Sequence, residues 1–248
     1  MAEEQAKSAL EGLVEEDEWG APSGPPQGLL NVNEDAVQRD LEEEVLRPES
    51  GKLIVLDAGG VVLDGLANTK VVEEVVRLSG VGFWTVNAYF RNQLYLPASR
   101  GERTEDWVFE ELELRFGRMS TADLESAAKL VTQPLPGVPE ALQRLSENAQ
   151  LWMLSNYIAP WLRGSLSYRG LYYYFKKIFI SSETGLRKPD PEAYALVLKA
   201  WGRAAADVAF VDDSEANVAA AQEAGMFAIL ATGDTAAWEA SLNEWLGS

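Results

Sequence analysis

The sequence predicts an α/β fold in which a parallel β-sheet covered by helices is interrupted by an inserted all-helical domain. Five short apolar runs lie along the chain, and helix-length amphipathic segments separate most of them, as in parallel strands joined by crossover helices. The gap between the first two runs, residues 57–150, holds several helical patterns and no strand-like run. An insertion of that length between consecutive strands is typical of a separate helical domain.

The predicted elements follow from these patterns in chain order. The strands are the apolar runs Leu53–Leu56, Leu151–Leu154, Ile178–Ile180, Val208–Val211 and Phe227–Leu230. The helical patterns in the first gap are Val71–Leu78, Phe83–Leu94, Thr104–Phe116, for which Thr104 is a candidate N-cap, and Thr121–Val131. We therefore expect residues 51–65 and 136–248 to form a Rossmann-like core and residues 66–135 to form a helical cap.

Residues 1–50 differ in composition from the rest of the chain. They hold 14 acidic and 3 basic side chains, so they carry −11 of the total formal charge of −18. The stretch Gly20–Pro26 is rich in glycine and proline, which predicts a mobile acidic extension. An apolar stripe at Val37, Leu41 and Val45 has helical spacing, so a short helix here could instead dock on the body or on a protein partner.

Composition excludes several kinds of chemistry. The 248 residues include no cysteine and no histidine, which rules out disulfides, thiolate zinc sites and imidazole-based catalysis. The negative charge argues against nucleic acid and anionic membranes as partners, because both bind basic surfaces. No apolar run approaches the roughly 18 residues that span a bilayer, and the first residues lack the pattern of a signal peptide, so we expect a cytoplasmic protein.

Polar side chains follow the predicted strands at the edge where open parallel sheets bind ligands. They are Asp57 after the first strand, Ser155-Asn156 after the second, Lys188 in the loop after the third, and Asp212-Asp213 after the fourth. Taken singly, each has a structural explanation as a turn or helix-capping residue. Adjacent carboxylates such as Asp212-Asp213 repel one another and are best tolerated around a cation, although capping of the helix that starts near Ser214 also explains them.

The four motifs together resemble those of the haloacid dehalogenase superfamily. They are LIVLDAGGVVLD, LWMLSNY, TGLRKPDPEAY and FVDDSEANVAAAQEAGM, and they occur in the order of that family with the cap insertion after the first strand. The match covers residues 52–233. The cap stretch Arg100–Thr104, followed by a helix, also resembles the subgroup with a small helical cap that includes sugar-phosphate phosphatases.

The resemblance implies a magnesium-dependent phosphatase that acts on a small phosphorylated metabolite, in some relatives a sugar phosphate. Asp57 would attack phosphorus and form an aspartyl-phosphate, Ser155 would donate to a phosphoryl oxygen, and Lys188 would neutralise charge in the transition state. Mg²⁺ would be held by the predicted metal ligands Asp57, Asp212, Asp213 and the carbonyl of Gly59. The substrate would also contact Asn156, Gly60 and the cap residue Arg100.

Gly59 departs from the pattern of most phosphatases in this family, which carry a second Asp there as general acid and base. Loss of such a group typically costs on the order of 10²–10⁴ in rate. Asp64 could substitute for it if the segment that leads to the cap folds over the site. The departure leaves two alternatives open: a non-catalytic or regulatory protein that keeps the fold, and a dehalogenase that uses Asp57, against which the Asp212-Asp213 pair argues.

Overall fold

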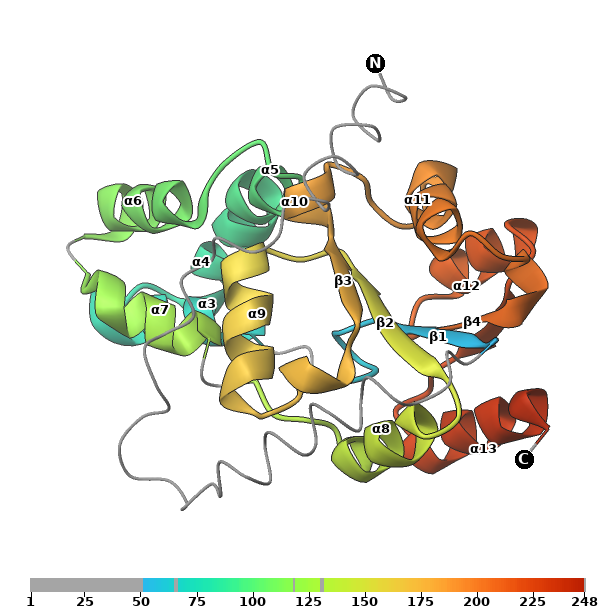
Figure 1. Ribbon diagram of the computed structural model, residues 1–248. Helices are drawn as coiled ribbons and strands as arrows, with labels where there is room; N and C mark the ends of the chain where they lie inside the picture. The colour runs from blue at the N-terminus through green and yellow to red at the C-terminus, as the bar shows by residue number, and fades with distance from the viewer. Residues whose placement is uncertain (1–50, 65–66, 118, 130–131, 248) are drawn as a thin grey trace, which may run out of the picture.

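A five-stranded parallel sheet forms the centre of the protein (Figure 1). The computed structural model describes residues 51–64, 67–117, 119–129 and 132–247. The strands are β1 (Leu53–Leu56), β2 (Gln150–Ser155), β3 (Lys177–Ile180), β4 (Val208–Asp212) and β5 (Phe227–Leu230). They lie in the order β3-β2-β1-β4-β5, so the first strand is at the centre. Both the α/β class and the five predicted strands are confirmed.

Helices cover both faces of the sheet because its central strands are apolar on both sides. In β1, Ile54 and Leu56 belong to one buried cluster, whereas Leu53 and Val55 belong to the other. Figure 1 shows α8 and α13 on one face and α11 and α12 on the other. Full burial of each such side chain contributes about 1.5–3 kcal/mol.

The helices from α8 onward are mostly short, and several begin or end at recognisable residues. Their bounds are α8 (Val138–Ser146), α9 (Ala159–Tyr168), η2 (Tyr172–Tyr174), α10 (Ser181–Thr184), α11 (Pro191–Trp201), η3 (Ala205–Asp207), α12 (Glu215–Glu223) and α13 (Thr235–Leu246). Proline lies at the first or second position of α8, α9 and α11, where its missing N–H costs no helical hydrogen bond. Gly202 and Gly247 end α11 and α13 in the left-handed conformation.

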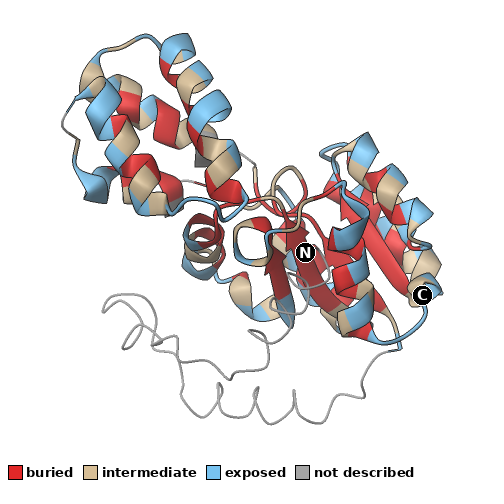
Figure 2. Ribbon diagram, turned by 90° about the horizontal axis from the view of Figure 1, so that it is seen from above, coloured by how far each residue is buried: buried red, intermediate tan, exposed pale blue. Residues whose placement is uncertain are grey.

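A group of helices lies between β1 and α8, as the long first gap in the strand pattern predicts. They are α3 (Ala67–Ser79), α4 (Phe83–Tyr89), the π-helix η1 (Phe90–Tyr95), α5 (Leu96–Ser99), α6 (Glu105–Phe116) and α7 (Thr121–Lys129). Figure 2 shows them as a lobe beside the sheet, with buried residues on their inward faces. Thr104 caps α6, since its side chain accepts a hydrogen bond from the N–H of Trp107. The domain boundaries at 66 and 135 stay a prediction.

The two connections to this helical lobe, which we call the cap, run side by side. The N–H of Asp64 donates to the carbonyl of Gln133 at 2.9 Å, and the N–H of Leu135 donates to the carbonyl of Val62 at 3.1 Å. The chain therefore leaves and re-enters the core next to the carboxyl end of β1. This places the cap above the edge where the motif residues emerge.

The acidic N-terminal segment lies outside the described residues. The predictions of a mobile extension, of a helix at Val37, Leu41 and Val45, and of a protein partner therefore stay predictions. Within the part of the chain that the structure describes, no helix has the length and apolarity needed to cross a bilayer.

Candidate functional site

The order of the strands brings the predicted site residues together. β1 pairs with β2 on one side and with β4 on the other, so the residues that follow these three strands emerge next to one another. The N–H of Asp57 donates to the carbonyl of Val211 at 2.9 Å, which holds the backbone of Asp57 against β4. Asp57 thus lies between the ends of β2 and β4, in the middle of the sheet edge.

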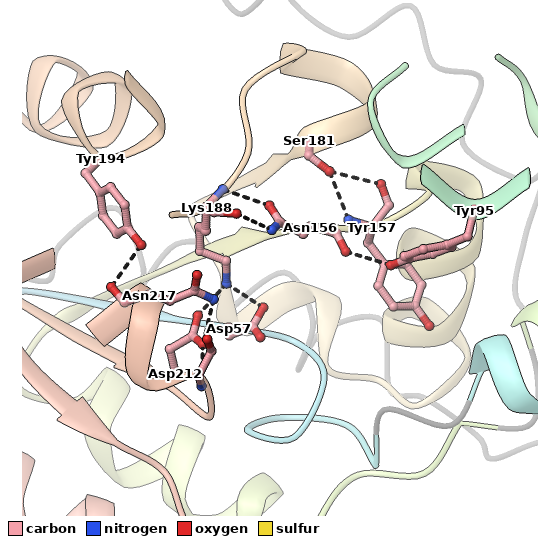
Figure 3. A network of polar contacts seen from close by, with 10 residues as sticks. Asp57, Tyr95, Asn156, Tyr157, Ser181, Lys188, Tyr194, Asp212 and Asn217 are labelled. Carbon is pink, nitrogen blue, oxygen red and sulfur yellow. Dashed lines mark hydrogen bonds and ion pairs between the residues drawn. The ribbon is translucent and has the colours of Figure 1, made fainter. Parts of the chain in front are cut away.

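A buried ammonium group joins two of the predicted carboxylates (Figure 3). The Nζ of Lys188 lies 2.8 Å from Oδ1 of Asp57 and 2.6 Å from Oδ2 of Asp212. The side chains of Lys188 and Asp212 are 1% and 0% exposed, whereas that of Asp57 is 12% exposed. Asp57 is therefore the member of this carboxylate–lysine cluster that a ligand can reach.

Burial and the neighbouring charges act against each other on the nucleophile candidate. The pKa of Asp57 is raised to about 6: burial raises it most, the charge of Lys188 acts in the opposite direction, and the charge of Asp212 adds to the rise. For Lys188, burial alone would lower the pKa, yet the two carboxylates raise it above the ordinary lysine value. The lysine consequently stays protonated at neutral pH, and its charge favours the carboxylate form of Asp57.

The other oxygen of Asp212 is held by its own motif. Oδ1 accepts hydrogen bonds from the N–H of Ser214 and from Nδ2 of Asn217, each at 2.9 Å. The carbonyl of Asn217 in turn accepts from the hydroxyl of Tyr194 at 2.9 Å. Asn217 is not among the site residues predicted from the sequence. Its position five residues after Asp212, in the first turn of the following helix, is the signal that could have found it.

The third carboxylate, Asp213, packs against the glycine loop after β1. A Cβ atom on Gly60 would lie 2.3 Å from Oδ2 of Asp213, and Gly60 has φ +78, so only glycine fits here. The N–H of Gly60 donates to the carbonyl of Leu63 at 2.8 Å. A substrate contact through this N–H would have to displace that bond, and the predicted role of Gly60 in substrate binding stays a prediction.

The acidic side chains fit a hard divalent cation. One carboxylate oxygen each from Asp57, Asp212 and Asp213 lies within 4.8 Å of the others. Three carboxylates and the ammonium of Lys188 leave a formal excess of two negative charges, which a divalent cation would balance. The carbonyl of Gly59 accepts no hydrogen bond from another described residue, so it can serve as a further oxygen ligand.

The remaining predicted residues have different surroundings. Ser155 is buried at the end of β2, and its hydroxyl has no hydrogen-bond partner among the described residues. The side chain of Asn156 is bonded to the main chain of Lys188, so a substrate contact falls to its backbone. Arg100 is half-exposed on the cap, where its guanidinium lies 4.0 Å from the carboxylate of Glu102. These substrate-binding roles stay predictions.

Gly59 and Asp64 bear on the missing acid and base. Gly59 is not among the glycines with positive φ, so its backbone conformation accepts an L side chain. Asp64 is partly buried beside the cap connection, where its N–H is bonded to Gln133. A buried tyrosine, Tyr157, ends the second motif, and burial raises the pKa of its hydroxyl well above the usual value, with smaller contributions from Tyr95 and Asp64.

Comparison with known proteins agrees with this geometry. A family model described as haloacid dehalogenase-like hydrolase matches residues 52–225. The sesquiterpene phosphatase astK of Aspergillus oryzae is 27% identical over 179 residues, which cover 71% of this chain and 87% of that protein. The drimenol cyclase drtB of Aspergillus calidoustus is 28% identical over 188 residues, which cover 72% of this chain. The chain spans 34% of the length of that cyclase, about a third.

A solved structure shares the fold. An HAD family enzyme from Bacteroides thetaiotaomicron, crystallised in complex with magnesium and inorganic phosphate, superposes with a TM-score of 0.65. It is 22% identical, and the match covers 75% of this chain and 98% of that one. The likeness extends to the parallel sheet and its flanking helices.

Proposed function

Because this chain belongs to the haloacid dehalogenase-like hydrolase family, we propose that it is a magnesium-dependent phosphatase that hydrolyses a small phosphomonoester through an aspartyl-phosphate. The observation that carries the proposal is the carboxylate–lysine cluster, in which the buried ammonium of Lys188 contacts both Asp57 and Asp212. A reactive carboxylate beside a fixed positive charge suits attack on an anionic phosphoryl group. The phosphatase activity of the relative astK supports the same reaction class.

The reaction proceeds in two displacements at phosphorus. A carboxylate oxygen of Asp57 forms a bond to phosphorus as the bond to the alcohol oxygen of the substrate breaks, which leaves an aspartyl-phosphate and an alkoxide or alcohol. Water then attacks phosphorus, the bond to the Asp57 oxygen breaks, and inorganic phosphate leaves. In both steps the ammonium of Lys188 would stabilise the phosphoryl oxygens, together with the hydroxyl of Ser155, which has no partner among the described residues.

The residues present fit a bound magnesium ion. Asp57, Asp212, Asp213 and the carbonyl of Gly59 supply hard oxygen donors with the matching excess charge. When bound, Mg²⁺ offsets the repulsion between an anionic nucleophile and an anionic phosphoryl group. Ser214 and Asn217 keep Asp212 oriented through their hydrogen bonds to Oδ1.

The leaving group sets a limit on the substrate. Gly59 carries no side chain that could protonate the departing oxygen, so substrates whose leaving groups depart as stable anions are favoured. The anomeric phosphate of a sugar and an acyl phosphate meet this condition. The proposed substrate is therefore a small phosphorylated metabolite whose leaving group departs easily.

The test is turnover of an aryl phosphate by the full chain with and without Mg²⁺. We expect release of phosphate that needs magnesium and disappears in excess chelator, because the three carboxylates then repel both one another and the substrate. Undiminished turnover in chelator would overturn the role of the metal. Absence of turnover on a panel of phosphorylated metabolites would favour the non-catalytic alternative, and halide release from a 2-haloacid would identify a dehalogenase.

A further inference from the structure

Lys188 must be held accurately in order to contact two carboxylates at once. Its Nζ lies 2.8 Å from Asp57, directly after β1, and 2.6 Å from Asp212, at the end of β4. The residue itself lies in the loop between α10 and α11, outside every strand. The hydrogen bonds between strands therefore do not fix the backbone of Lys188, so other contacts must fix it.

The side chain of Asn156 holds both polar groups of the Lys188 main chain. Nδ2 of Asn156 donates to the carbonyl of Lys188 at 2.7 Å, and the N–H of Lys188 donates to Oδ1 of Asn156 at 3.0 Å. The amide thus pairs with the N–H and the C=O of one residue, as a neighbouring strand does in a sheet. Aspartate lacks the donor for this pair and serine lacks the second polar atom, so the geometry is specific to a primary amide at this distance from the backbone.

The cap contacts this same residue. The hydroxyl of Tyr95, from the end of η1, donates to the carbonyl of Asn156 at 2.8 Å (Figure 3). The neighbouring cap residue Ser99 accepts hydrogen bonds from Ser181 and from Arg187, which precedes Lys188 in the chain. The cap is thereby bonded to α10 and to the residue that directly precedes Lys188.

We propose that Asn156 is a positioning residue, whose two hydrogen bonds to the Lys188 backbone keep the ammonium of Lys188 at the nucleophile. Through its hydrogen bond to Asn156, Tyr95 couples the position of the cap to the position of Lys188. The assignment of Lys188 to the phosphoryl group rests on the proposed function. The pairing of Asn156 with Lys188 and Tyr95 rests on the geometry alone. The role of Asn156 is accordingly indirect, and it acts on the reaction through the lysine.

The first experiment removes the amide and measures kcat and KM for an aryl phosphate at a temperature well below unfolding. Asn156→Ala should lower kcat about 10- to 100-fold with KM changed less than about threefold, because a misplacement on the order of 1 Å near the chemistry costs that much. Asn156→Asp keeps the side-chain volume and should also lose activity, since it lacks the donor. A kcat close to that of the parent in both folded variants would overturn the inference.

The second experiment reads the position of the lysine without turnover. Acetylation of lysines in the full chain is followed residue by residue by mass spectrometry, with the exposed Lys199 as internal control. Loss of two hydrogen bonds should raise the labelling rate of Lys188 about tenfold or more in Asn156→Ala and leave that of Lys199 unchanged. An unchanged labelling rate at Lys188 would contradict the positioning role of Asn156. This test does not depend on phosphatase activity of the protein.

The third experiment tests the coupling to the cap. Tyr95→Phe should lower kcat about threefold alone and should have no further effect in the Asn156→Ala background, because the two residues act through one path. Tyr89→Phe is the matched control, since the Tyr89 hydroxyl donates to Glu111 inside the cap. Additive effects of Tyr95→Phe and Asn156→Ala, or an equal loss in Tyr89→Phe, would show a general structural effect of the cap.

Discussion

The carboxylate–lysine cluster and the cap segment that contacts the core, residues 95–100, satisfy their polar groups in different ways. In the cluster, Lys188 and Asp212 are buried, charged and bonded at both ends. In the cap segment, Tyr95 makes a hydrogen bond to a main-chain carbonyl of the core, and Arg100 is half-exposed. Breaking a buried charge pair costs about 3–5 kcal/mol, whereas a neutral hydrogen bond contributes about 0.5–1.5 kcal/mol net. The contact through Tyr95 is therefore less costly to break than the ion pair between Lys188 and Asp212.

Loss of the nucleophile is the change expected to have the largest effect. Asp57→Asn should lower kcat by at least about 10⁴-fold, because the amide is nearly isosteric but cannot attack phosphorus. The fold should remain, since Lys188 keeps Asp212 as a partner. Turnover and far-UV circular dichroism measured on the same preparation check both points. A variant that retained most of its activity would place the nucleophile elsewhere.

Removal of the Lys188 ammonium tests how much this group contributes to turnover and to the stability of the carboxylate–lysine cluster. Lys188→Met should lower kcat about 10²- to 10³-fold, the usual cost of one preorganised stabilising group. It should also destabilise the fold by about 3–5 kcal/mol, because it leaves buried carboxylates without their partner. Denaturant unfolding of the parent and the variant measures the second effect. Lys199→Met, at an exposed position of α11, is the control and should change neither quantity.

A carboxylate at position 59 would supply the general acid and base that the core lacks there. Gly59→Asp should raise kcat/KM for a sugar 6-phosphate by up to about 10²-fold relative to an aryl phosphate, because an alkoxide needs a proton as it leaves and an aryloxide does not. The backbone at Gly59 accepts the side chain, since its φ is not positive. The ratio of the two kcat/KM values is independent of enzyme concentration. No change in this ratio would mean that protonation comes from another group or does not limit the reaction.

The smallest effect is expected for a substitution in the cap. Arg100→Ala should raise KM by about threefold and leave kcat within about twofold, since an exposed guanidinium contributes little to a screened contact. Arg103→Ala, another cap arginine, whose guanidinium lies over Trp107, is the matched control and should leave both values unchanged. Steady-state kinetics at two salt concentrations checks the result. A large fall in kcat for Arg100→Ala would show that the cap contributes directly to the chemistry.

The sequence alone determined the strands and the acidic residues at their ends. Apolar runs such as Leu53–Leu56 carry a local signal, and a polar residue directly after such a run falls at the carboxyl edge of a parallel sheet. The N-cap of α6 at Thr104 was predictable for the same reason, since capping depends on residues three apart. Each of these features is encoded within a few consecutive residues.

The tertiary structure alone decided how these residues act on one another. Asn156 and Lys188 are separated by 32 residues, and Tyr95 and Asn156 by 61, so no local pattern pairs them. The requirement for glycine at position 60 comes in part from Asp213, which directly follows β4 and is far away in the sequence. Such pairings depend on strand order and on how the cap folds back over the core. They arise only when packing brings distant segments within hydrogen-bond distance, which propensity and periodicity along the chain do not encode.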